Sequence, residues 1–129
     1  MTDDFEAVHV RLKDILRRHA ATAGLAVTKD GPGGMAIEMA GLEGKPWGYV
    51  GGTRMGKRYV SYYLMSAYAD PSLVASISPE LRRRMQGKAC FNFTKVDEPL
   101  FAELEALTVE GIARQPALAA AALAARPAR

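Results

Sequence analysis

The sequence is poor in the residues that tie small secreted proteins together, since its 129 residues include one cysteine and two histidines. One cysteine cannot form a disulfide within the chain, so a disulfide-stapled scaffold is excluded. No apolar run approaches the ~18 residues of a membrane span, so no membrane association is expected. The first residues are acidic and lack the basic start of a signal peptide, which predicts a cytoplasmic location of the bacterial type.

The chain also lacks the short motifs that mark common catalysts, because it has no CxxC, HExxH, GxSxG or P-loop pattern. His9 and His19 are ten positions apart on one expected helix, about 15 Å along its axis, too far to share a metal ion. The glycine pairs at 33–34 and 51–52 precede no helix start, so hairpin turns explain them better than phosphate binding. No catalytic residue is assigned, and no cofactor is predicted.

Charge of one sign is not concentrated either, since 17 basic and 14 acidic residues leave a net charge of +3. The basic clusters are short, at 17–18, 54–58 and 82–84. A nucleic-acid-binding protein usually has a continuous stripe of Lys and Arg. We therefore interpret these clusters as solvated surface charge, and a nucleic-acid partner is not expected.

Glycine is abundant, with 12 residues, ten of which lie between positions 24 and 56. Most of them stand between short segments of alternating or β-branched residues, where turns need glycine. Antiparallel pairing is expected because parallel strands need long crossovers. The predicted strands are 25–29, 35–40, 47–53 and 58–66, with a fifth at 88–94.

The helices are predicted from apolar residues at steps of three and four. A capping box of Asp3 and Glu6 is expected to start the first helix, and Gly24 to end it. Helical segments follow at 70–77 and 79–86, and a last helix begins near Asp97 and is expected to stop at Pro116. The fold class is α+β, an antiparallel sheet of about five strands with helices on one face, in the order α-β-β-β-β-α-β-α. The domain is expected to span 1–115, followed by an Ala-rich tail at 116–129.

One face of this sheet is the candidate binding site. If Val60, Tyr62 and Leu64 face the helices, the intervening residues form an open face rich in aromatic side chains. Glycines beside Trp47 indicate a bulge or the close approach of another group. The candidate binding residues are Trp47, Tyr49, Gly51, Gly52, Tyr63, Met65, Lys88, Cys90 and Asn92. The prediction is a non-enzymatic module for a protein or small-molecule partner; alternatively, the segment 68–77 or a second subunit of a homodimer covers this face.

Cys90 offers a second alternative, an unrecognised cysteine-dependent enzyme. Lys88 and Cys90 are two positions apart on one strand and share a face, and a neighbouring cation lowers a thiol pKa. The competing interpretation is a half-buried structural thiol.

Residues 59–112 resemble the YdhG-like domain family of small bacterial proteins of unknown function. The resemblance rests on the runs YYLM at 62–65, YAD at 68–70, LRRRM at 81–85 and GKACFNF at 87–93, with Asp97 and the helix after it. It implies a frataxin-like fold and, as a further alternative, a carrier of ferrous iron for iron–sulfur assembly. Under that alternative Trp47 belongs to the docking surface, and the acidic residues that stand in for the metal-binding ridge are Asp3, Asp4, Glu6 and Asp14.

Overall fold

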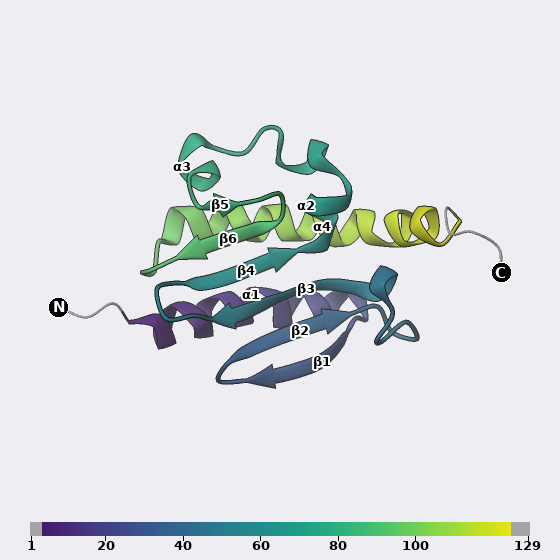
Figure 1. The fold of residues 1–129 in the computed structure, drawn as a ribbon, viewed down its shortest axis with the longest axis horizontal. Coiled ribbons are helices and arrows are strands. Elements are labelled where there is room, and N and C mark those ends of the chain that lie inside the picture. The colour runs from purple at the N-terminus through teal and green to yellow at the C-terminus, as the bar shows by residue number, and fades with distance from the viewer. Residues whose placement is uncertain (1–3, 125–129) are drawn as a thin grey trace.

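The computed structural model describes residues 4–124 and contains one antiparallel sheet of six strands backed by helices (Figure 1). The strands are β1 (Ala26–Gly31), β2 (Gly34–Glu38), β3 (Tyr49–Met55), β4 (Val60–Leu64), β5 (Met85–Gln86) and β6 (Cys90–Phe93). The helices are α1 (Phe5–Ala23), α2 (Met65–Ala69), α3 (Pro79–Arg82) and α4 (Glu98–Ala124), with 3-10 turns η1 (Pro46–Gly48) and η2 (Pro71–Val74). The strand order is β1-β2-β3-β4-β6-β5, which confirms the α+β class and adds one short strand to the expected five.

Helices α1 and α4 lie behind the same face of the sheet and leave its other face without a helix (Figure 1). Strand β4 shows how the sequence makes this arrangement. Val60, Tyr62 and Leu64 are fully buried against the helices, whereas Ser61 and Tyr63 between them are only partly buried. The two-residue alternation of a half-buried strand is confirmed here.

The start of α1 differs from the prediction by one residue. Asp4, not Asp3, caps the helix, because its side chain accepts a hydrogen bond from the backbone N–H of Ala7. Asp3 lies outside the described residues. Gly24 ends the helix with φ at 71°, a left-handed conformation that glycine adopts without strain, as predicted.

Two predicted strands are shorter than expected, and this moves two candidate site residues. Trp47 lies in η1, not in a strand, because Pro46 fixes the backbone at the start of a 3-10 turn. Met65 begins α2, since β4 ends at Leu64. The predictions that placed these two side chains in the sheet are therefore wrong.

The segment 79–86 is not one helix. Helix α3 ends at Arg82, and Met85 and Gln86 pair with Phe91 and Cys90 to form β5 at the sheet edge. The backbone N–H and C=O groups of this segment find partners in the neighbouring strand β6, whereas the sequence pattern predicted hydrogen bonds within a helix.

Proline does not end the last helix, which continues through Pro116 to Ala124. Pro116 lies on the exposed side of α4, while Gln115 and Ala119 on either side of it are buried. Packing of these neighbours offsets the hydrogen bond that proline cannot donate. The expected boundary at 115/116 thus falls inside a helix. None of the helices in residues 4–124 is long and apolar enough to cross a membrane.

A buried polar pair joins α1 to the sheet and makes stability depend on pH. The His9 ring nitrogen Nε2 lies 2.7 Å from the hydroxyl of Thr53, and both residues are buried. Burial, and then the charge of Lys13, lower the pKa of His9 below its ordinary 6.5, although Asp30 opposes the shift. Below pH 6.5, His9 therefore binds a proton more readily in the unfolded chain than in the folded protein. The free energy of unfolding falls as the pH falls for this reason.

We expect the free energy of unfolding, measured by urea denaturation, to decrease from about pH 6.5 down to the lowered pKa of His9. His9→Gln should flatten this part of the profile because glutamine does not titrate. His19→Gln is the control, since it leaves the His9–Thr53 pair in place. A profile that is unchanged in His9→Gln would contradict the assignment.

Candidate functional site

The outer face of the sheet brings together side chains from five strands. The cross-strand register aligns Glu38 with Tyr49, Gly52 with Tyr63 and Tyr63 with Cys90. Five of the nine predicted binding residues meet on this face: Tyr49, Gly52, Tyr63, Cys90 and Asn92. The two-residue alternation along β4 and β6 was enough to find Tyr63, Cys90 and Asn92, whereas Tyr49 and Gly52 share the face because of a bulge in β3.

Tyr49 and Tyr63 form the aromatic part of the face. Their ring centroids are 5.6 Å apart with planes tilted by 49°. Burial raises the pKa of Tyr49 to about 12 and also raises the pKa of Tyr63. Both phenols are therefore neutral at physiological pH, so they keep their O–H donors and do not repel an anion.

The two central glycines have different roles. A register shift between Ile37 and Glu38 leaves a bulge in β3 next to Gly51, and a Cβ at Gly51 would point toward Leu16 of α1. A Cβ at Gly52 would lie on the outer face, closer than 3.0 Å to the hydroxyl of Tyr49. The predicted bulge occurs, and the groups that come close to Gly52 belong to the protein itself: the carbonyl oxygen of Met35 and the hydroxyl of Tyr49.

The remaining predicted residues lie elsewhere. Trp47 and Met65 line a groove beside α4, and the sulfur of Met65 accepts a hydrogen bond from the Tyr63 hydroxyl at 3.8 Å. Lys88 lies 5.8 Å from the ring centroid of Tyr68, in a cation–π contact. The spacing along the sequence does not predict the positions of Trp47 and Met65, because the chain leaves the strands at η1 and α2.

The chemistry of Cys90 does not favour a nucleophile. Burial raises the pKa of its thiol, so the thiolate is less populated at neutral pH than in a free cysteine. Lys88, the expected activating cation, lies over the ring of Tyr68. Cys90 is the single cysteine of the chain and lies partly exposed on the outer face.

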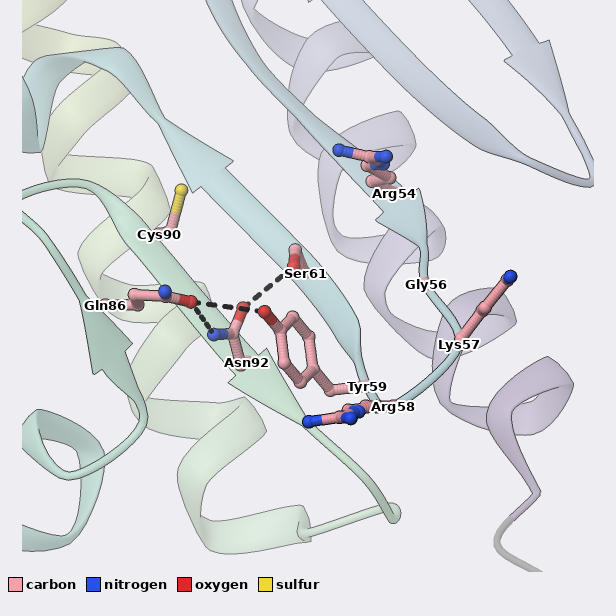
Figure 2. A pocket seen from close by; sticks show the side chains of 9 residues that line it. All are labelled: Arg54, Gly56, Lys57, Arg58, Tyr59, Ser61, Gln86, Cys90 and Asn92. Atoms are coloured by element: carbon pink, nitrogen blue, oxygen red, sulfur yellow. Dashed lines mark hydrogen bonds between the residues drawn. The ribbon is translucent and has the colours of Figure 1, made fainter.

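A pocket of about 450 Å³ lies on this face beside the turn between β3 and β4 (Figure 2). Its lining residues are Arg54, Gly56, Lys57, Arg58, Tyr59, Ser61, Gln86, Cys90 and Asn92. We call it the cationic pocket, because three of its residues carry positive charge and none carries negative charge. Within residues 4–124, Arg54, Lys57 and Arg58 form no ion pair.

From the sequence alone, these three cations are interpreted as the solvated charge of a tight turn, and not as part of a binding site. One signal could have found them. The alternation along β4 places Ser61 on the outer face, and Arg54 pairs with Ser61 across the hairpin, so Arg54 lies on that face as well. The basic cluster at 17–18, on α1, differs because its charges are paired: Arg17 contacts Asp30 and Arg18 contacts Glu105.

A hydrogen-bond network fixes the polar floor of the cationic pocket (Figure 2). Ser61 donates to the Oδ1 atom of Asn92 at 2.8 Å, and the Nδ2 group of Asn92 donates to Gln86 at 2.9 Å. Tyr59 also donates to Gln86, at 3.3 Å. With its Oε1 atom occupied twice, Gln86 keeps its amide N–H groups for another acceptor.

The predicted acidic ridge is not gathered into a metal site. Asp3 lies outside the described residues, Asp4 caps α1, and Asp14 pairs with Arg18 at 2.9 Å. Glu6 is exposed in the first turn of the same helix. No group of three or more His, Cys, Asp or Glu in residues 4–124 is arranged to hold a metal ion.

Three comparisons with known proteins complete the description of the site. Protein-family models, curated proteins and solved structures each give no match to the chain. The resemblance of residues 59–112 to the YdhG-like family therefore stays a prediction from the sequence.

Proposed function

We propose that this protein is a non-enzymatic binding module that holds a small anionic molecule against the outer face of its sheet. The observation that carries the proposal is the group of Arg54, Lys57 and Arg58 in one pocket with no acidic residue among its lining. Arg54 and Arg58 lie on either side of the polar network without a counterion among the residues that line the pocket, so a bound anion would neutralise their charge (Figure 2).

The floor of the cationic pocket supports the same conclusion. The amide N–H groups of Gln86 can donate hydrogen bonds, as a phosphate or carboxylate requires, while the Tyr59 hydroxyl donates to the Gln86 Oε1 atom and helps to orient that amide. The network through Asn92 holds these groups in place before a ligand binds. A preorganised site loses less conformational entropy when the ligand binds.

The size of the pocket favours a small molecule over a polymer. Its volume of about 450 Å³ lies in the range of small-molecule sites. The +3 net charge is too small for a protein that tracks a nucleic-acid backbone. The neutral rings of Tyr49 and Tyr63 farther along the face are available for an apolar part of the ligand.

Pyrophosphate is the probe that tests the proposal most directly. Backbone NMR shifts should change for residues 54–61, Gln86 and Asn92 upon titration, and more weakly at high salt. Arg54→Ala/Arg58→Ala should weaken binding by about tenfold or more, since each charge-assisted hydrogen bond contributes about 1.5–3 kcal/mol. Pyrophosphate should also slow the alkylation of Cys90, the single cysteine, because this residue lines the pocket.

The matched control is Lys29→Ala/Arg83→Ala, which removes the same charge at exposed positions outside the cationic pocket. This variant should bind pyrophosphate as tightly as the unmodified protein. Equal loss of affinity in both double variants would show that only net charge matters, and would overturn the proposal. Absence of NMR shifts at millimolar pyrophosphate would do the same.

A further inference from the structure

Helix α4 continues beyond the sheet (Figure 1), and a second hollow lies beside this part of the helix. It has a volume of about 720 Å³ and is formed by η1 with the loop before it, by α2 and by the last part of α4. We call it the α4 groove. Its lining is mainly apolar, with Trp47, Met65, Tyr68, Ala69, Leu118, Ala119 and Ala122, and also includes Gly44, Lys45 and Gln115.

The α4 side of the groove follows one stripe of the helix. Gln115, Leu118, Ala119 and Ala122 recur at steps of three and four, so they lie on one face over about 10 Å of helix length. Two of the four are alanines, which leave space between α4 and the aromatic residues opposite. This shape accepts an elongated apolar body.

The lining of the α4 groove carries a single charge, which is positive. Lys45 lines the α4 groove and forms no ion pair within residues 4–124, and no acidic residue lines it. Lys88 adds a second cation beside Tyr68. A ligand with a negative group at one end would place that group near these lysines while its apolar part lies against α4.

Gln115 provides a separate sign that the groove is incomplete. Its side chain is 3% exposed, and its Nε2 group donates to the carbonyl oxygen of Tyr49 at 3.3 Å. Its Oε1 atom is buried and accepts no hydrogen bond within the described part of the chain. Buried acceptors normally have partners, and because a carboxylate ligand has no N–H or O–H to donate, a water molecule enclosed in the groove beside the ligand would donate to this atom.

We propose that the α4 groove binds a small organic acid with an elongated apolar body and one anionic group, of which an alkyl carboxylate is the simplest example. This site is independent of the cationic pocket and of its proposed ligand. The volume lies within the range of small-molecule sites, and the combination of apolar walls with a few polar groups is typical of them.

The single tryptophan makes the groove testable, because Trp47 lines it and any change in tryptophan emission reports on this residue. Octanoate, used below the concentration at which it forms micelles, should change the emission saturably. Octylamine, with the same apolar body and opposite charge, should bind at least about tenfold more weakly. Lys45→Glu should weaken octanoate binding by about tenfold and favour octylamine.

Two further variants separate the groove from the rest of the surface. Ala122→Phe fills the groove at an exposed position and should abolish the response to octanoate without changing thermal stability. Lys29→Glu makes the same charge change elsewhere and should leave octanoate binding intact. Pyrophosphate protection of Cys90 should be normal in Ala122→Phe, so failure at one site is distinguishable from failure at the other.

Three results would overturn the proposal. One is equal affinity for octanoate and octylamine, which would mean that the lysines do not select charge. Another is an unchanged Trp47 emission up to millimolar octanoate. The third is a dimer, detected by light scattering, that Ala122→Phe dissociates, because a second copy of the chain would then occupy the α4 groove.

Discussion

Phe91→Ala is expected to lower the free energy of unfolding by about 3–5 kcal/mol, the usual cost of removing a large buried aromatic side chain. Phe91 is fully buried on the helix side of β6, and its backbone pairs with Tyr62 on one neighbouring strand and Met85 on the other. Its loss would leave a cavity between the sheet and the helices. Since small domains have only about 5–15 kcal/mol of stability in total, this single change should bring the protein close to unfolding.

Urea denaturation followed by circular dichroism measures this effect, and Asn92→Ala is the matched control. Asn92 is the next residue along β6 but faces outward into the cationic pocket. Its replacement should cost much less stability while weakening pyrophosphate binding, because it removes the link between Ser61 and Gln86. If both variants lost equal stability, the assignment of inner and outer faces to β6 would be wrong.

Gly52→Ala should also destabilise the protein, with a loss of about 1–3 kcal/mol in the free energy of unfolding. A Cβ at this position would lie closer than 3.0 Å to both the carbonyl oxygen of Met35 and the hydroxyl of Tyr49. The carbonyl belongs to the neighbouring strand and cannot move without disturbing the β2–β3 pairing. Thermal denaturation of the variant should therefore show a clear decrease in melting temperature.

Two further variants test whether the clash at Gly52 causes the loss of stability: Gly33→Ala and the double variant Gly52→Ala/Tyr49→Phe. A Cβ at Gly33 meets no atom within 4 Å, so that variant should be close to neutral. Removing the Tyr49 hydroxyl should restore only part of the stability lost in Gly52→Ala, because the clash with Met35 remains. Full recovery in the double variant would show that the backbone contact is unimportant.

The single cysteine and the single tryptophan lie in the two candidate binding sites, Cys90 in the cationic pocket and Trp47 in the α4 groove. Each site thus has a native reporter that needs no added label. Ligand screens can follow alkylation of Cys90 and emission of Trp47 in the same sample. A molecule that changes only one of the two signals is assigned to one site directly.

Local pattern determined much of what the sequence showed by itself. The alternation in Arg58–Ser66 and Lys88–Thr94 predicted which side of β4 and β6 is buried, because side chains along a strand alternate between faces. Turn glycines and helix caps located most element boundaries to within a few residues. The outer-face positions of Tyr63, Cys90 and Asn92 followed from the same two-residue period.

Tertiary structure decided the features that depend on contacts between distant parts of the chain. Pro116 remains inside α4 because its neighbours Gln115 and Ala119 pack against the rest of the protein. Trp47 joins the last turns of α4, almost 70 positions away, instead of the sheet face. Arg54 and Arg58 acquire a shared pocket with Gln86 only when β6 pairs with β4 and β5 pairs with the far edge of β6. The local secondary-structure propensity of a residue does not specify such long-range contacts, because the free energy of packing outweighs that propensity.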